Sequence, residues 1–325
     1  MTVFLIRRLM QSVAVLLAMS ILVFVGVYAI GDPVQLLISP EATQAEREQT
    51  IRSLGLDRPL WEQYLLFLKG ALRGELGNSY IHNIPAVKLI IQRLPATLEL
   101  AMIAILIAIL LGIPLGLWAG MYPKSFFSRS IMGGSVLGFS LPTFWVGLMM
   151  ILLFSIYLGL LPTSGRGKTV EFLEVPVSFL TWDGLKHILL PAVNLALYPL
   201  ALVIRLTRTG MMEILLLDFV KFARAKGLAE RRVIFVHVLK NILIPIVTVI
   251  GIQFGTLLAF AVVTESIFAW PGMGKLIIDS INLLDRPVIV AYLLITVFIF
   301  TLINLITDIL YSILDPRVRL GGPGQ

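Results

Sequence analysis

The sequence contains no cysteine and only three histidines, His82, His187 and His237. Without cysteine the chain has neither disulfide bonds nor thiolate metal ligands, so the sequence does not indicate a redox compartment. The three histidines lie far apart along the chain and predict no metal cluster. We therefore expect neither a metal nor another cofactor on this chain.

Charged residues are also scarce. Only 14% of the residues are Asp, Glu, Lys or Arg, and 58% are hydrophobic, whereas soluble domains average about 25% charged and about 45–50% apolar residues. A soluble core of this size cannot bury so much apolar surface, so the composition predicts a chain surrounded by lipid. The net charge of +7 then indicates membrane orientation and contact with anionic lipid rather than nucleic-acid binding.

Apolar stretches long enough to cross a membrane occur at six places in the sequence. Crossing about 30 Å of hydrocarbon takes about 20 helical residues. The predicted spans lie at residues 9–31, 98–121, 131–161, 187–207, 241–265 and 287–312. They predict an all-α, polytopic membrane protein with six transmembrane helices in a single domain over residues 1–325. The first span is longer than the apolar core of a signal peptide, so we expect it to be retained.

Basic residues predict the orientation of these helices, because short loops rich in Lys and Arg stay in the cytoplasm. On the side of the N-terminus basic residues outnumber acidic ones, most densely at 208–240, whereas the two signs nearly balance on the other side. Both termini and residues 208–240 are therefore predicted to be cytoplasmic. The long segment 32–93 is predicted to be external, with short surface helices at 41–54 and 61–72.

Motifs for catalysis are weak. The residues 167–169, Gly-Lys-Thr, look like the end of a phosphate-binding loop, but Pro162 stands where that loop needs its first glycine. We therefore expect no enzyme activity and no ATP hydrolysis by this chain. Glu99 is expected to be exposed at the outer interface. Asn304 and Asp308, one helical turn apart, are predicted to face the bundle interior, in a structural or a functional role.

Proline and glycine mark two further features. The run GFSLPTFWVG at 138–147 predicts a broken helix beside a translocation pathway. The pathway candidates are Ser140, Pro142, Thr143, Gln253 and Thr256, of which the last two could equally serve packing. Glycines four residues apart, Gly112, Gly116 and Gly120, predict close packing between spans, with a subunit interface or a moving contact as the alternative.

The residues from 218 to 227 predict a short, separate helix. Asp218 suits an N-cap and Gly227 suits the position just after a helix. A helix shorter than about 12 residues needs a docking partner. Three interpretations remain open: a basic helix lying on lipid, a nucleic-acid site, which is disfavoured, and a dock for a cytosolic partner. The residues concerned are Asp218, Phe219, Lys221, Phe222, Ala223, Arg224, Lys226 and Gly227, of which Phe219, Phe222 and Ala223 share one face.

Longer motifs resemble a known family. They are ARAKGLAERRVIFVHVLKN followed by ILIPIVTVIGIQFGTLL, LGLDRPLWEQY at 54–64, LPATLEL at 94–100, GFSLPTFW at 138–145, TESIFAWPGMGK at 264–275 and LDPRVR at 314–319. In this order they resemble the permeases of ABC importers, specifically the dipeptide, oligopeptide and nickel group. The resemblance implies a type I importer permease fold in the bacterial inner membrane, with a cytoplasmic coupling helix at 218–227 between spans 4 and 5.

The same resemblance implies partners and cargo. The partners would be a second, homologous permease that completes the pathway, two cytosolic ATPases that bind ATP and Mg, and an external solute-binding protein. Di- or oligopeptides are the expected cargo. Nickel chelates, glutathione or another small solute are alternatives, and an ATP-independent secondary transporter is the alternative from a different class.

Two regions of the sequence qualify what the resemblance implies, the signature around Gly227 and the loop 265–275. The general signature reads Glu-Ala-Ala, three residues, then Gly, and only Ala223 and Gly227 match it here, so no role for a glutamate carries over. The loop 265–275 is expected either to protrude or re-enter near the cargo of the binding protein, or to form a compact turn. Its candidate residues are Glu265, Trp270, Pro271 and Gly272.

Overall fold

The computed structural model describes residues 2–29, 43–53 and 57–314. Predictions for 30–42 and 315–325, including most of the motif LDPRVR, lie outside the described residues. The chain divides into two compact units. The larger unit combines Leu94–Lys275 with the chain from Phe300 onward, and the smaller combines Thr2–Arg93 with Leu276–Ile299.

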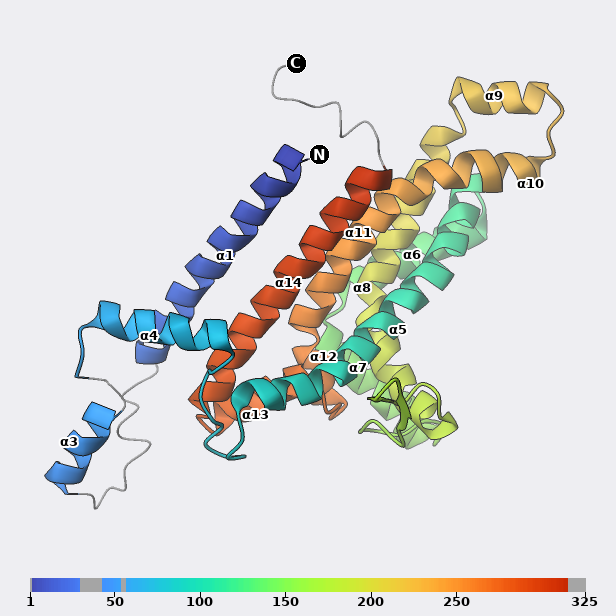
Figure 1. Cartoon of the computed structure of the whole chain (residues 1–325). Helices are drawn as coiled ribbons and strands as arrows, with labels where there is room; N and C mark the ends of the chain where they lie inside the picture. Colours follow the sequence, from blue (N-terminus) through green and yellow to red (C-terminus); the bar gives the residue numbers. More distant parts are fainter. Residues whose placement is uncertain (1, 30–42, 54–56, 315–325) are drawn as a thin grey trace. The chain divides into compact units, whose positions relative to one another are not determined.

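Helices long and apolar enough to cross a membrane number five in the described residues, or six if one bent pair is a single span. The five are α1 (Thr2–Ala29), α5 (Ala86–Met121), α8 (Trp182–Ile214), α11 (Leu239–Phe260) and α14 (Arg286–Leu314), which Figure 1 labels. The bent pair joins α6 (Phe126–Ser140) to α7 (Thr143–Met150) and the π-helix η1 (Ile151–Tyr157). The prediction of an all-α, six-span membrane protein is confirmed.

The bent pair has the break that its proline predicts. The axes of its two parts differ by 108°. Leu141 is extended, with φ −79° and ψ 137°, because proline at the next position disfavours helical geometry in the residue before it. Pro142 then stands at the N-cap of α7, where its missing N–H costs no helical hydrogen bond. The helix therefore stops at Ser140 and starts again at Thr143.

In the larger unit, the glycine ridge of α5 packs directly against α8. Gly112, Gly116 and Gly120 face Val203, Thr207 and Met211, which repeat with the same spacing of four residues. Missing side chains on one helix allow the other backbone to come close. The close-packing interpretation of these glycines therefore describes a contact inside this chain.

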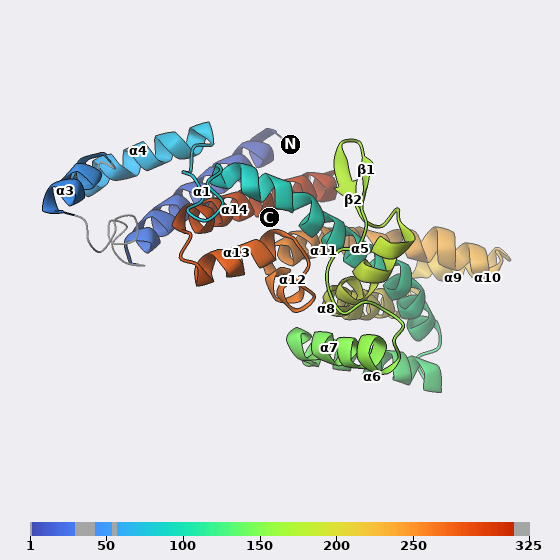
Figure 2. The same cartoon turned by 90° about the horizontal axis from the view of Figure 1, so that it is seen from below.

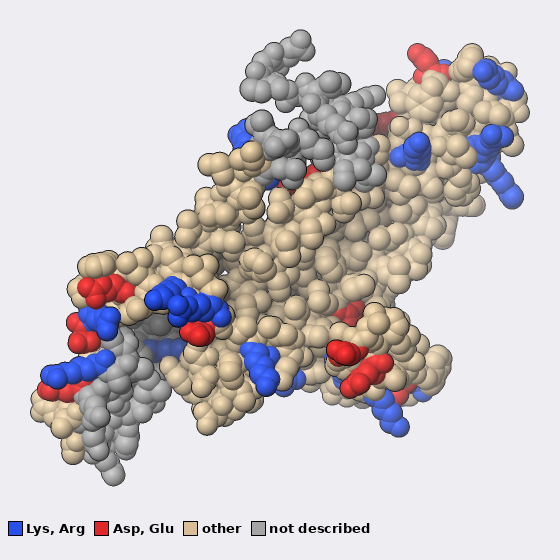
Figure 3. Space-filling view, viewed as in Figure 1, with Lys and Arg blue, Asp and Glu red and all other residues tan. Residues whose placement is uncertain are grey.

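The other elements of the larger unit lie toward its two ends. At one end a hairpin of β1 (Val170–Phe172) and β2 (Val175–Val177) stands beside α5 (Figure 2). At the other end α9 (Asp218–Ala225), α10 (Glu230–Arg232) and the π-helix η2 (Val233–Val238) connect α8 to α11. Figure 3 shows mostly Lys and Arg, with acidic atoms beside them, over the α9–α10 end and both signs around the hairpin, with a largely uncharged surface between the two ends.

The smaller unit holds α1 together with α3 (Gln44–Ser53) and α4 (Leu60–Arg73). The bounds of α3 and α4 are close to those predicted for the two surface helices, 41–54 and 61–72. Its core includes a loop fixed to the turn before α14. Ser79 Oγ donates to Asp285 Oδ2 at 2.5 Å, and the Tyr80 N–H donates to Asp285 Oδ1 at 3.1 Å. In the chain order, α12 (Val262–Ile267) and α13 (Met273–Asn282) precede that turn.

Candidate functional site

The helix α9 follows α8 after a short turn. Its N-cap is Leu217, whose backbone is extended at φ −72° and ψ 148°, so the prediction that Asp218 caps the helix is wrong. Asp218 is the first helical residue instead, and its carboxylate accepts a hydrogen bond from Lys221 Nζ at 2.9 Å. The prediction for Gly227 is confirmed, because its φ of +76° is a left-handed conformation that favours glycine.

One side of α9 is buried against its own chain. Val220 and Ala223 belong to a hydrophobic cluster that also contains Met211 of α8 and Val233 and Val238 of η2. Ala223 therefore turns inward, although the sequence groups it with Phe219 and Phe222. This packing supplies the docking that so short a helix requires, and it fixes which face of α9 remains accessible.

The accessible face of α9 carries two phenylalanines. Phe219 is 43% exposed and Phe222 is 62% exposed, at positions i and i+3 of one stripe. Lys226 Nζ lies 4.5 Å from the ring centroid of Phe222, a cation–π contact that holds the ring beside a positive charge. We call Phe219, Phe222 and Lys226 the phenylalanine stripe.

Ion pairs within the segment from α9 to α10 join Lys221 to Asp218 and Arg224 to Glu230. Arg224 donates to Glu230 through Nη2 at 2.5 Å and Nε at 3.2 Å, which closes the turn between α9 and α10. The hydrogen bond to Glu230 raises the pKa of Arg224, and the hydrogen bond from Lys221 lowers the pKa of Asp218. The sequence did not indicate the pair of Arg224 with Glu230, because its two members lie on separate helices.

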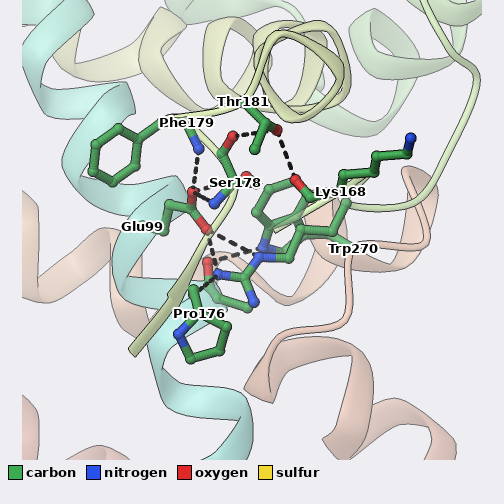
Figure 4. A network of polar contacts seen from close by, with 9 residues as sticks. Glu99, Lys168, Pro176, Ser178, Phe179, Thr181 and Trp270 are labelled. Carbon is green, nitrogen blue, oxygen red and sulfur yellow. Dashed lines mark hydrogen bonds and ion pairs between the residues drawn. The ribbon is translucent and has the colours of Figure 1, made fainter. Parts of the chain in front are cut away.

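At the other end of the same unit, Glu99 is the centre of a buried polar network (Figure 4). Its Oε1 accepts from the N–H and Oγ of Ser178, at 2.6 and 2.7 Å, and from the Phe179 N–H at 2.9 Å, while Arg166 donates to Oε2 through Nε at 3.0 Å and Nη2 at 2.5 Å. The expectation that Glu99 is exposed is wrong, since it is 5% exposed. α5 starts well before Glu99, and the segment after the hairpin covers the carboxylate.

The loop after α11 is a compact turn. Trp270 is fully buried and its Nε1 donates to the Ala96 carbonyl at 2.8 Å. Glu265, which lies between the α11 and α14 spans, accepts from Thr97 Oγ1 at 2.7 Å and from the Lys275 N–H at 2.9 Å. Burial raises the pKa of Glu265, and these hydrogen bonds partly offset the rise. The buried positions favour the compact alternative over a protruding loop.

Glycine at position 272 is required by this turn, because a Cβ there would overlap the carboxylate of Glu265. Pro271 is half-buried between Trp270 and Gly272. The structure thus brings the four candidate residues of the loop into one turn against the start of the second span. Their functional role stays a prediction.

The pathway candidates fall into two places. Ser140, Pro142 and Thr143 are exposed at the break between α6 and α7. Gln253 and Thr256 lie half-buried on α11, and Thr256 Oγ1 donates back to the Ile252 carbonyl of its own helix at 3.0 Å. Gln253 Oε1 is buried and has no hydrogen-bond partner among the described residues.

Asn304 and Asp308 are both half-buried on α14. Between them, Thr307 lies against Gly251 of α11, so this side of α14 packs closely against a neighbouring span. Within the part of the chain that the structure describes, no three His, Cys, Asp or Glu side chains gather as a possible metal site.

Sequence reasoning also missed a buried polar contact between spans. Asn194 of α8 is fully buried, and its Nδ2 donates to Thr264 Oγ1 of α12 at 3.2 Å. The two residues are separated by 70 positions. A single sequence carries no signal for a pair so far apart, and the same holds for Ser79 with Asp285.

The apolar helices, the broken third span and the amphipathic helix between spans 4 and 5 define a polytopic membrane protein. The chain belongs to the family described as binding-protein-dependent transport system inner membrane component, whose profile matches residues 112–320. The profile of the N-terminal part of such membrane components matches residues 1–101. The protein is therefore a multi-pass inner-membrane protein and a permease of the ABC importer type.

Relatives of known name match along nearly the whole chain. The dipeptide transport system permease DppB of Escherichia coli K12 is 39% identical over 333 residues, covering 97% of this chain and 98% of DppB. The oligopeptide transport system permease AppB of Bacillus subtilis is 40% identical over 321 residues, covering 98% of this chain and 100% of AppB. The glutathione transport system permease GsiC of Escherichia coli O6:H1 is 36% identical over 317 residues, covering 97% of this chain and 98% of GsiC.

Among solved structures, a chain of the inward-facing methionine ABC transporter MetNI has the same fold. It aligns with a TM-score of 0.55 and 16% identity, covering 71% of this chain and 98% of the MetNI chain. The fold is thus the type I ABC importer permease fold.

Proposed function

We propose that this chain is one of two permease subunits of an ATP-driven importer and that its cargo is di- or oligopeptides. The second permease completes the translocation pathway, two cytosolic ATPases bind ATP with Mg, and an external solute-binding protein delivers the cargo. The names of the dipeptide and oligopeptide permeases that match over nearly full length support this cargo. The match to a glutathione permease keeps glutathione as the second candidate.

Both termini and the α9–α10 end are cytoplasmic in this proposal, and the β1–β2 hairpin is external. The gathering of Lys and Arg at the α9–α10 end supports this orientation, because basic loops are retained in the cytoplasm (Figure 3).

The phenylalanine stripe is the observation that carries the proposal. Large apolar rings exposed on a short helix outside the spans favour a protein partner that covers them. Because Val220 and Ala223 already fix α9 to its own chain, the stripe faces away with a defined orientation. In the proposal it seats in a groove of one ATPase, and closure of the ATPases pushes α9 and switches the spans between outward and inward access.

The test truncates Phe222 to alanine in the assembled transporter. Loss of an aromatic anchor at the centre of an interface costs about 2 kcal/mol, which is roughly a 30-fold weaker association with the ATPases. We expect peptide uptake and transport-linked ATP hydrolysis in proteoliposomes to fall together, and the ATPases to dissociate more readily during purification.

Phe126→Ala is the matched control, because Phe126 is 85% exposed and is the first residue of α6, on the same side of the membrane in the proposed topology. It should leave association and uptake unchanged. Undiminished ATPase association and coupling in a well-expressed Phe222→Ala variant would contradict the proposed docking. Uptake by this chain alone, driven by an ion gradient, would instead favour a secondary transporter.

A further inference from the structure

The external helix α4 has an apolar arc that its own chain covers only in part. Tyr64 and Phe67 point to α1, where each ring contacts Phe24 at centroid distances of 5.4 and 5.7 Å. Beside them on the helix surface lies a second stripe, Trp61, Leu65 and Leu72, at positions i, i+4 and i+11. Leu65 is 54% exposed and Leu72 is 83% exposed. Half of the apolar arc is therefore accessible.

The charged residues of α4 gather on a separate arc, which we call the polar arc. Glu62, Lys69 and Arg73 lie there together with Leu66, which is 48% exposed, so the charges of the helix are confined to one side of its axis. Such a division is typical of a helix at the boundary between water and hydrocarbon, with cations able to reach lipid phosphates. Tryptophan at position 61 also suits the lipid headgroup region.

A hydrogen bond fixes the depth of α4 along α1. Ser20 Oγ and Tyr64 Oη are 2.8 Å apart, and the apolar stretch of α1 includes Ile6–Gly26. Gly26 lies six helical residues beyond Ser20, a rise of about 9 Å, so Tyr64 is tied at least that far inside the apolar stretch. Interfacial helices bury their apolar faces to a depth of about 5–10 Å.

The neighbouring surface of α1 is apolar and exposed as well, including Ile21, Leu22 and Val25. Figures 1 and 2 show α4 running obliquely across the C-terminal part of α1. Because α1 is a spanning helix, lipid surrounds whatever lies at the depth of Ser20 and is not covered by protein.

We propose that the stripe Trp61, Leu65 and Leu72 is embedded in the lipid of the membrane leaflet where α1 ends, so that α4 anchors the external segment to the bilayer. This leaflet is the outer one in the proposed orientation, which is the only part of the inference that rests on the proposed function. The occupant of the stripe is the acyl-chain boundary of the bilayer, and Lys69 and Arg73 lie toward the headgroups.

The absence of native cysteine permits single-cysteine spin labelling without background. Labels at Leu65→Cys and Leu72→Cys report the stripe, and labels at Glu62→Cys and Lys69→Cys are the matched controls on the polar arc. The full chain is reconstituted in bilayers of phosphatidylethanolamine and phosphatidylglycerol. Collisions with oxygen, which concentrates in lipid, are compared with collisions with a water-soluble nickel chelate.

The ratio of oxygen to nickel collisions should be several-fold higher at Leu65→Cys and Leu72→Cys than at Glu62→Cys and Lys69→Cys. Equal access of the nickel chelate at all four positions would overturn the proposal and place α4 in water. Exclusion of both reagents from the stripe would also overturn it, since a protein surface would then cover these residues. The readout needs no ATPase and no cargo, so it does not depend on whether the transport proposal holds.

Discussion

The substitution Gly116→Ala tests whether α5 and α8 pack as closely as the structure shows. An added Cβ would lie 2.5 Å from Thr207 Cβ and 2.8 Å from the Ile204 carbonyl oxygen. Thr207 is β-branched and buried, and the carbonyl belongs to the helix backbone, so neither neighbour can turn aside at low cost. The two helices must separate to admit the methyl group.

The expected change in the free energy of unfolding is the difference between two opposing effects of the added methyl group. Overpacking a tight contact costs about 1–3 kcal/mol, whereas alanine in a helix interior is favoured over glycine by about 0.5–1 kcal/mol. With two rigid neighbours the net loss should be about 2 kcal/mol at Gly116. Gly134 of α6 is the control, since a Cβ there meets nothing within 4 Å. Gly134→Ala should therefore be neutral or stabilising by up to about 1 kcal/mol.

The assay is unfolding of the purified transporter with increasing sodium dodecyl sulfate or temperature, with both variants measured beside the unmodified protein. The two substitutions add the same methyl group to a helical glycine, so their difference isolates the contact with α8. Equal stability of Gly116→Ala and Gly134→Ala would refute the close packing of the glycine ridge within this chain. It would then favour the alternative of an interface between subunits.

Two further predictions concern the end of the larger unit that carries the β1–β2 hairpin. Arg166→Ala leaves the buried carboxylate of Glu99 without its cation, which costs about 3–5 kcal/mol of stability. Trypsin should therefore cleave after Lys168 faster than in the unmodified protein, and an unchanged cleavage rate would contradict the network. For Glu265 the raised pKa means that the ionised form destabilises the folded turn, so the unfolding temperature should rise as the pH falls from neutral toward 4.5, the usual pKa of glutamate. Glu265→Gln removes the titrating group and should flatten this dependence, whereas an equally steep pH profile in the variant would refute the assignment.

The sequence predicted features that depend on local chemistry. The break at Pro142 follows from the steric effect of proline on the residue before it, and the conformation of Gly227 follows from the missing side chain. The number of spans follows from the length of the apolar stretches. Each of these signals lies within a few helical turns of the feature that it predicts.

Features that depend on distant residues were missed or wrongly predicted. Glu99 was expected to be exposed because its position suits the end of a span, but its donors Arg166 and Ser178 come from a segment far along the chain. The predicted start of α9 is one residue too late, because Leu217 and not Asp218 is the N-cap. The residue pattern is compatible with either position, and only the backbone conformation distinguishes them. Burial and backbone conformation of this kind are decided by tertiary packing.

The glycine ridge and α9 were separate motifs in the sequence, and packing joins them. Met211 stands opposite Gly120, where an added Cβ would lie 2.6 Å from Met211 Cβ. The same Met211 side chain belongs to the cluster that buries Val220 and Ala223 of α9. Because protein interiors are close-packed, α9 cannot move toward its own chain without displacing Met211, and Met211 cannot move toward α5 without opening the ridge. In the proposed coupling, a push on the phenylalanine stripe would therefore be delivered to α5 and α8 together.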